Sequence, residues 1–201
     1  MVATPDGGAL VNASTLSIDG LVTFTSPVWG DERGFFREWY TQRDVGGLGV
    51  AFPIAQANLS MSARNVVRGL HYSLAPEGQA KLVTCAYGTL DDVIVDVRVG
   101  SPTYGVVEVV HLAGDLGVSV LLPAGVAHGF CVTSERAALS YLLSSPFNAP
   151  FELEIDPFDP AIAVPWPLDG EPIVSAKDAA APSLAERAAA SQLPRWSPAR
   201  A

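Results

Sequence analysis

The amino-acid sequence predicts an all-β protein, built as a barrel or a sandwich. Short segments alternate apolar and polar residues, and this period of two is how a half-buried strand points successive side chains to opposite faces. Clusters rich in Gly, Pro, Ser and Asp separate these segments at similar intervals, and helical periodicity is scarce until the C-terminal end. Many short strands at even spacing are typical of β-sandwiches and β-barrels.

The clearest of the predicted strands is Leu90–Arg98. Val93, Val95 and Val97 face one way, and the alternate, mostly charged positions face the other, which predicts a half-buried strand. Turn signals such as Gly100-Ser101-Pro102 separate this strand from its neighbours. In chain order, the predicted strands are Leu16–Phe24, Lys81–Tyr87, Leu90–Arg98, Gly105–Leu112, Val118–Leu122, Gly129–Thr133 and Ala137–Leu143.

One helix is predicted, near the C-terminus. Ser183 and Glu186 have the spacing of a capping box, which opens the stretch Leu184 to Leu193. We expect this helix to dock on the outside of the barrel. The flanking residues 179–182 and 194–201 are rich in Ala, Pro and Arg, and we expect them to be poorly ordered.

The chain has the length of one domain with a tail. It has 201 residues, of which 49% are hydrophobic, enough to bury a substantial core. We therefore assign residues 1–178 to one compact domain and residues 179–201 to a C-terminal helix and tail.

The net charge of −9 argues against a nucleic-acid binder, because such proteins need clustered Lys and Arg. An anionic small molecule must be held by local positive charge, for which Arg33, Arg68, Lys81 and Lys177 are candidates. No signal peptide or long apolar run is visible, so the sequence predicts a soluble cytoplasmic protein without a membrane partner. Cys85 and Cys131 lie far apart within apolar runs, which predicts buried residues without a chemical role.

The segment from Pro123 to His128 has a Pro-x-Gly-x-x-His turn that resembles the second motif of cupin barrels. In those barrels the turn delivers a His into the barrel mouth. A metal-binding cupin also has a His-x-His pair, but here His71 is followed by Tyr72 and Ser73, and His111 lies on a different predicted strand. Transition metals usually need three or four protein ligands, so we predict a metal-free barrel.

Without a metal, His71 is a candidate general base. An imidazole with an ordinary pKa near ~6.5 suits proton removal at cellular pH when a carboxylate orients it. Arg68 and Lys81 flank His71 at spacings suited to a charged cleft. The alternative is a structural His whose nitrogens are bonded within the core.

A series of short segments, in order along the chain, together resemble one known family. They are Asp31–Phe36, Gln56–Asn58, Val67–Tyr72, Gly78–Val83, Asp92–Arg98, Gly100–Gly105, Pro123–Phe130, Trp166–Leu168 and Ser175–Asp178. Through them the chain is similar, from about Trp29 to Asp178, to the dTDP-4-dehydrorhamnose 3,5-epimerase family. This resemblance implies a cupin-type jelly-roll β-barrel with a short C-terminal helical segment and no cofactor. It also implies a homodimer in which an N-terminal strand joins the neighbouring sheet.

The same resemblance implies the roles of individual residues toward a dTDP-4-keto-6-deoxysugar substrate. His71 is the general base supported by Asp178, Tyr141 is the acid on the opposite face of the sugar, and Lys81 stabilises the enolate oxygen at C4. Phe147 stands where the family usually has a Tyr that stacks on thymine. The remaining implied binding residues are Arg33, which reaches the partner's site, Glu38, Gln56, Asn58, Arg68, His128, Glu152 and Lys177.

Period-two arithmetic places Tyr141 on the side of Leu139 and Lys81 on the side of Val83, but it does not show that both sides face the interior. A packed core tyrosine is the alternative for Tyr141. The family inverts C3 and C5, which we favour, or a single centre. More remote alternatives are a metal-dependent cupin enzyme and a non-catalytic sugar-nucleotide binding barrel.

Two departures from the family pattern, besides Phe147, affect the surroundings of the predicted site. Ala57 stands where relatives often carry an acidic residue, and the segment Asp156–Pro160 replaces a turn after the last strands. Neither departure removes a proton-transfer group.

Overall fold

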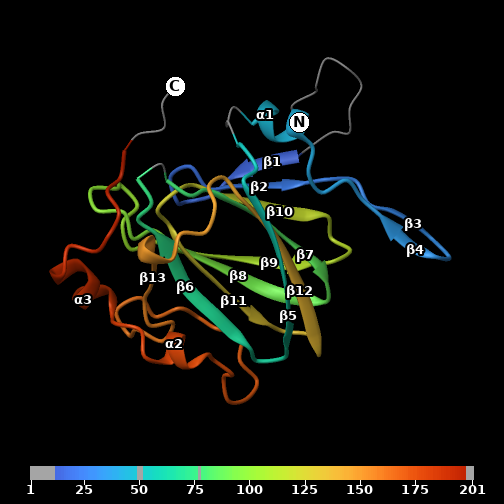
Figure 1. Cartoon of the computed structure of the whole chain (residues 1–201). Helices are drawn as coiled ribbons and strands as arrows, with labels where there is room; N and C mark the ends of the chain where they lie inside the picture. The colour runs from blue at the N-terminus through green and yellow to red at the C-terminus, as the bar shows by residue number, and fades with distance from the viewer. Residues whose placement is uncertain (1–11, 49–51, 77, 198–201) are drawn as a thin grey trace.

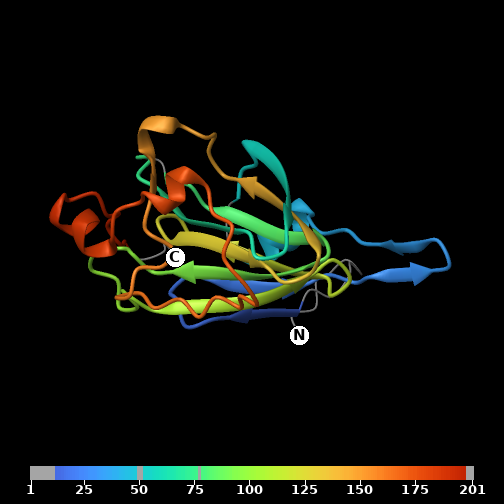
Figure 2. The same cartoon turned by 90° about the horizontal axis from the view of Figure 1, so that it is seen from below.

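The computed structural model describes residues 12–48, 52–76 and 78–197 of the chain. Two antiparallel sheets face each other as a jelly-roll barrel, and a separate two-stranded hairpin projects from it (Figures 1 and 2). The prediction of an all-β jelly roll is confirmed.

The larger sheet has six strands in the order β1-β2-β10-β7-β12-β5, and the smaller has five in the order β13-β6-β11-β8-β9. The strands of the larger sheet are β1 (Asn12–Thr15), β2 (Val22–Thr25), β10 (Val118–Leu122), β7 (Lys81–Tyr87), β12 (Arg136–Leu143) and β5 (Gln56–Ala63). Those of the smaller sheet are β13 (Glu152–Glu154), β6 (Val67–Ser73), β11 (Ala127–Val132), β8 (Thr89–Val95) and β9 (Val107–Ala113). The remaining elements are the hairpin strands β3 (Trp29–Asp31) and β4 (Gly34–Phe36), the helices α1 (Gln42–Gly47), α2 (Ala176–Ala179) and α3 (Leu184–Ala189), and the 3-10 helix η1 (Ala149–Phe151).

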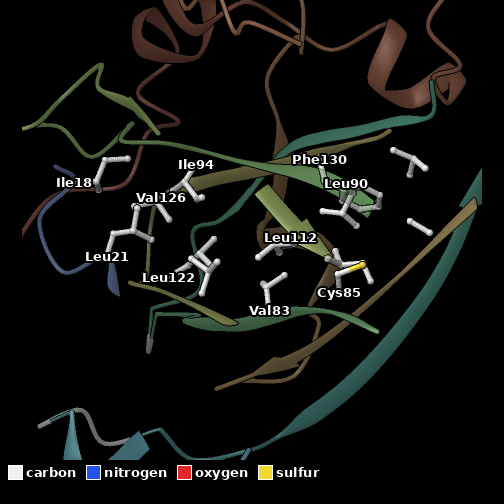
Figure 3. Close-up of a cluster of buried hydrophobic side chains, with 14 residues drawn as sticks. Ile18, Leu21, Val83, Cys85, Leu90, Ile94, Leu112, Leu122, Val126 and Phe130 are labelled. Carbon is white, nitrogen blue, oxygen red and sulfur yellow. The ribbon is translucent and has the colours of Figure 1, made fainter. Parts of the chain in front are cut away.

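The main hydrophobic core fills the space between the two sheets. Inward side chains from both sheets meet there, including Val83, Ile94, Leu122 and Phe130 (Figure 3). Burying such side chains stabilises the fold by roughly 1.5–3 kcal/mol each, before the entropic cost of ordering the chain. This core holds the two walls of the barrel at a fixed separation.

A second core lies on the outer face of the five-stranded sheet. Val93, Val95 and Val97 contribute to it together with Ile155 and Leu193 from the C-terminal part of the chain. The alternation in Leu90–Arg98 therefore assigns residues to the correct faces of the strand. The expectation of a half-buried strand is wrong, because both faces are buried. The C-terminal segment covers the valine face, and the face of Asp92 and Ile94, which was expected to meet solvent, points into the barrel.

Two predicted strands are shorter than expected because turns interrupt them. Leu16–Phe24 is a hairpin rather than a strand: the N–H of Leu21 donates to the carbonyl of Ile18, and Gly20 has a φ of +82°. Gly adopts this left-handed conformation easily, so the chain forms a turn at Gly20 instead of one continuous strand. Ile18 and Phe24, on either side of the turn, are both buried and lie an even number of residues apart, which is why the hairpin imitates strand alternation.

Strand β8 ends at Val95, before the predicted end at Arg98. The Asp96 carboxylate accepts hydrogen bonds from the N–H of Arg98 and from the hydroxyls of Ser101 and Thr103. These local bonds compete with strand pairing and close a loop.

The sequence analysis missed the strands β1, β3, β4, β5, β6 and β13 and the short helices α1 and α2. Strand β6 carries no period-two signal because nearly all of its residues are buried on both faces. Within β6, Gly69 has a φ of +130°, and a Cβ there would lie 2.6 Å from the Cα of Gly129 in β11. The two glycines let these strands approach each other closely.

The C-terminal helix forms with its predicted capping box, but it stops at Ala189. Ser191 has a φ of +56°, and the N–H of Gln192 donates to the carbonyl of Arg187, which is a Schellman ending. The expectation of poor order is wrong for residues 179–182 and 194–197, because the carbonyls of Pro182 and Pro194 accept backbone hydrogen bonds from other segments. Residues 198–201 lie outside the described part of the chain. Within the described part, no helix has the length and apolarity needed to span a membrane.

Candidate active site

A cavity of about 500 Å³ opens between the two sheets at one end of the barrel. His71 from β6, Lys81 from β7, Tyr141 from β12 and Asp178 from α2 all line it. The volume lies within the range of roughly 300–1,000 Å³ usual for small-molecule sites. The four residues predicted to carry the chemistry thus come from four elements and meet in one place.

Tyr141 and Lys81 both point into the barrel. Tyr141 packs against the main core, which contains Leu139 from its own strand and Val83 from the strand of Lys81. Strands β12 and β7 pair directly, with Tyr141 opposite Val83. Periodicity could not show whether the sides of Tyr141 and Lys81 both face the interior, and their packing shows that both do.

His71 and Asp178 form a hydrogen-bonded pair, with 2.7 Å between His71 Nε2 and Asp178 Oδ1. Ser175 caps α2 by accepting the N–H of Asp178, which fixes this carboxylate on the helix. Burial alone raises the pKa of Asp178, but the hydrogen bonds from His71 and Ser175 outweigh it and lower the pKa overall. An ionised Asp178 accepts the Nε2–H of His71, which leaves Nδ1 with the lone pair that a base needs.

Lys81 lies within the cavity, with its Nζ 3.5 Å from the carbonyl oxygen of His71. Burial lowers the pKa of Lys81, and the nearby carboxylates of Glu152 and Asp92 partly oppose this effect. A cation fixed in such a buried site stabilises an oxyanion more than it would in bulk water.

Tyr141 is half-buried, and burial raises the pKa of its phenol, while Asn58 and Arg68 oppose the shift. The phenol therefore stays protonated at neutral pH, the state required of an acid.

Below these residues a smaller cavity of about 180 Å³ extends into the barrel. It shares Arg68, His71, Lys81 and Tyr141 with the larger cavity. Its other walls are formed by Ser60, His128, Gly129, Phe130 and Leu139. His128 is buried and its Nε2 lies 2.6 Å from Oδ1 of Asp92, a fully buried carboxylate.

The mouth of the larger cavity is organised around Gln56. Its amide nitrogen donates to Asn58 and its amide oxygen accepts the backbone N–H of Phe147, each at 2.9 Å. The Phe147 ring is 60% exposed at the mouth. Glu152 accepts hydrogen bonds from Ser73 and Gln79 nearby.

Two predicted cations also line the larger cavity. Arg68 donates from Nε to Ser62 at 3.1 Å, and Lys177 forms an ion pair with Glu154 at 2.8 Å. Both carry positive charge at the rim of the cavity, where an anionic group can be bound.

Arg33 and Glu38 do not meet the cavity within one chain. Arg33 lies on the β3–β4 hairpin, which extends away from the barrel (Figures 1 and 2). Its side chain is 85% exposed and pairs with Asp31. Glu38 is exposed beyond the same hairpin.

Sequence reasoning missed Ser60, Gln79 and Asp92. Ser60 lies on β5, which was not predicted as a strand, so its face was unknown. Asp92 could have been found from the sequence, because it is an acidic residue among the apolar residues of a predicted strand, where an unpaired charge is rarely tolerated.

The described residues contain no group of three or more His, Cys, Asp or Glu arranged to hold a metal ion. His111 lies away from the cavities and pairs with Asp91 at 2.7 Å. Cys85 and Cys131 are buried as predicted, and burial raises the pKa of each thiol to about 11.

A jelly-roll barrel whose cavity holds a carboxylate-supported imidazole, a buried ammonium and a protonated phenol defines a cupin-like enzyme equipped for proton transfer. Comparison with known proteins gives the particular family. The model of the dTDP-4-dehydrorhamnose 3,5-epimerase family matches residues 15–186, and the chain belongs to this family.

Individual relatives agree with this assignment. The chain is 43% identical over 182 residues to a dTDP-4-dehydrorhamnose 3-epimerase of Streptomyces niveus, covering 90% of this chain and 87% of the relative. It is 41% identical over 187 residues to a dTDP-4-dehydrorhamnose 3,5-epimerase of Mycolicibacterium smegmatis, covering 92% of each. Its structure resembles that of a 4-keto-6-deoxy sugar epimerase from the novobiocin biosynthetic gene cluster of Streptomyces spheroides, with a TM-score of 0.88, 42% identity, and 94% and 95% of the two chains covered.

Proposed function

We propose that this protein is a metal-independent epimerase that inverts the carbons beside the C4 ketone of a dTDP-4-keto-6-deoxyhexose. The observation that carries the proposal is the meeting of the His71–Asp178 pair, Lys81 and Tyr141 around one cavity. Epimerisation beside a ketone needs only a base, an acid and an oxyanion stabiliser, and these three are present.

The reaction begins when His71 Nδ1 removes the proton from a carbon next to the ketone. The electron pair moves to the C4 oxygen, and Lys81 stabilises the resulting enolate. Tyr141 then donates its proton to the opposite face of the same carbon, which inverts it. The raised pKa of Tyr141 keeps the proton on the phenol until the enolate forms.

The rest of the cavity suits a nucleotide sugar. Arg68 and Lys177 at its rim provide positive charge for the diphosphate, and the exposed face of Phe147 provides a stacking surface for the base. Gln56 fixes both Asn58 and the backbone of Phe147, so it supports this binding surface.

We favour inversion of both C3 and C5. A single-centre epimerase is the second candidate, because the similar proteins include one named a 3-epimerase and one named a 3,5-epimerase. The residues around the cavity provide a base and an acid for either outcome. The cytoplasmic location stays a prediction from the sequence.

The test is NMR of dTDP-4-keto-6-deoxyglucose with the protein in D2O. We expect deuterium at the inverted carbons, so label at C3 alone or at C3 and C5 identifies the regiochemistry. His71→Ala should abolish incorporation, and Tyr141→Phe should impair inversion more than proton removal. Loss of the base is expected to cost about 10²–10⁴-fold in rate.

His111→Ala is the matched control, because His111 also pairs with a carboxylate at 2.7 Å but lies away from the cavities. It should retain wild-type exchange. Normal exchange by His71→Ala would contradict the assignment of the base. Activity lost on chelation would indicate a metal-dependent cupin enzyme, and dTDP binding without exchange would indicate a binding protein.

We also propose a homodimer. The β3–β4 hairpin exposes Trp29, Phe35 and Phe36, and the rings of Trp29 and Phe36 stack with centroids 5.9 Å apart. An apolar hairpin that projects from its own barrel is suited to contact a second copy of the chain. Arg33 between the two strands would then lie within reach of the partner's site.

A further inference from the structure

The proposed reaction creates a proton imbalance inside the site. Each inversion adds one proton to His71 and removes one from Tyr141, so the next inversion requires an imidazole that has lost its proton and a phenol that has regained one. A sugar bound between the two groups separates them from each other. The protein therefore needs a route by which a proton returns from the base to the acid.

The inner cavity of about 180 Å³ lies where such a route is needed. Its wall includes both His71 and Tyr141, so it borders the base and the acid at once. It also borders Lys81, and it extends inward from the larger cavity that we assign to the nucleotide sugar. The volume exceeds that of several waters, which occupy about 30 Å³ each in the liquid.

The polar groups of the inner cavity are suited to hold water. Ser60 and His128 line the inner cavity, and the buried Oγ of Ser60 has no hydrogen-bond partner among the residues that the structure describes. A buried hydroxyl left without a partner costs free energy, so a water that bonds to it is stabilising.

Ser60 is placed on the interior face of β5 by strand register. Asn58, Ser60 and Ser62 share this face, while Leu59 and Met61 between them are exposed. Asn58 pairs with Tyr141 across the β5–β12 ladder, and Ser60 pairs with Leu139, the next inward residue of β12. The Ser60 hydroxyl thus lies one step deeper in the barrel than the phenol.

We propose that the inner cavity is a water-filled proton return path from His71 to Tyr141, with Ser60 as its relay. This inference rests on the proposed function. The imidazolium N–H bond of His71 breaks and its proton passes to a water. A proton then passes through the Ser60 hydroxyl, which accepts one and donates one, and the O–H bond of Tyr141 forms again. Protons and charge balance, and no other reactant is needed.

This path matters most for inversion of two carbons in one binding event. The first inversion uses the proton that Tyr141 already carries. The second requires Tyr141 to be reloaded while the sugar still covers the larger cavity. The return path therefore sets how fast the second carbon follows the first.

The test compares single-turnover and steady-state inversion in the Ser60→Ala variant, followed by NMR. With enzyme in excess, the first carbon should invert at the wild-type rate because Tyr141 starts protonated. With substrate in excess, turnover should slow after a burst of one inversion per site. We expect a loss of about tenfold, below the roughly 10²–10⁴-fold of a direct proton-transfer group, because water partly replaces the hydroxyl.

Ser60→Thr retains a hydroxyl, so it should turn over without the burst that we expect of Ser60→Ala. Ser119→Ala is the control, because the Ser119 hydroxyl is also buried but contacts Arg37 outside the two cavities, and it should show no burst. Ser60→Ala should keep the wild-type Tm, since no described protein group bonds to the hydroxyl that it removes and the waters of the cavity can bond to one another.

The proposal is overturned if Ser60→Ala slows the first inversion as much as steady-state turnover, which would make the hydroxyl a substrate contact. It is also overturned if the variant turns over like wild type. A wild-type protein that neither exchanges nor inverts the sugar contradicts the proposed function instead.

Discussion

Asp178 is the residue on which the proposed role of His71 as a base depends. Its carboxylate is buried, ionised and 2.7 Å from Nε2, so it selects the tautomer whose Nδ1 can accept a proton. The nearby Glu152 and Asp92 carboxylates act differently, because they support the charge of Lys81 rather than the imidazole.

Asp178→Asn should lower the rate of deuterium exchange at the sugar by about 10²-fold or more, the range for a general base. An Asn amide can donate to Nε2 and so favours the tautomer with a proton on Nδ1, which cannot act as the base. Exchange is measured by NMR, and dTDP affinity should stay unchanged. Asp169→Asn, at an exposed pair with Arg64, is the control and should behave as wild type. An active Asp178→Asn protein would show that His71 needs no carboxylate.

Among the elements, the loop after β8 contributes a buried ion pair. Asp96 and Arg98 are both buried, with 2.8 Å between their side chains, and Arg98 also donates to the carbonyl of Asp19 in the β1–β2 turn. Burial alone raises the pKa of Asp96, but hydrogen bonds from Arg98, Ser101 and Thr103 outweigh it and lower the pKa to about 2. The loop thus fastens β8 to the first hairpin.

Because the folded pKa of Asp96 lies below its ordinary 3.8, its contribution to stability is complete above about pH 4 and is lost as the pH falls toward 2. Asp96→Asn leaves Arg98 buried without a counter-charge and should lower the free energy of unfolding by about 3–5 kcal/mol at neutral pH. Urea unfolding between pH 7 and about pH 2 should show this difference shrinking in acid. The exposed Asp115→Asn is the control. A difference that does not vary with pH would contradict the role of the ion pair.

At the scale of the whole molecule, the predicted proton-transfer residues all line one cavity of the barrel, whereas Arg33 lies on the β3–β4 hairpin that projects away from it (Figure 1). The proposed dimer, in which a second copy of the chain completes the site, would explain why Arg33, a predicted binding residue, points outward here.

Mixing Arg33→Ala and His71→Ala subunits tests this arrangement. If Arg33 serves the partner's site, each mixed dimer contains one site with both residues intact, so activity should recover to about half of wild type per mixed dimer. Two Arg33→Ala subunits should remain impaired. The measurement is sugar epimerisation after subunit exchange, with the dimer confirmed by analytical ultracentrifugation. Mixtures without recovery would show that Arg33 acts within its own chain or not at all.

The sequence alone predicted the fold class and named the candidate residues for the chemistry. The strands Lys81–Tyr87 and Val118–Leu122 were predicted with their full bounds, because turn signals such as Tyr87-Gly88 and Pro123-Ala124-Gly125 mark where each strand ends. Motifs around His71, Tyr141 and Asp178 named the candidate proton-transfer groups, since these side chains are what the reaction requires.

Only the tertiary structure decided which faces meet and which residues surround the cavity. Strand β6, which carries His71, is buried on both faces, so its sequence does not show which residues face the cavity. The outer valines of β8 are covered by side chains from the C-terminal part of the chain, including Leu193. Ser60 and Asp92 became visible as parts of the site only once β5, β8 and β12 were placed in register. Burial and proximity are properties of packing between distant segments, and local periodicity carries no information about them.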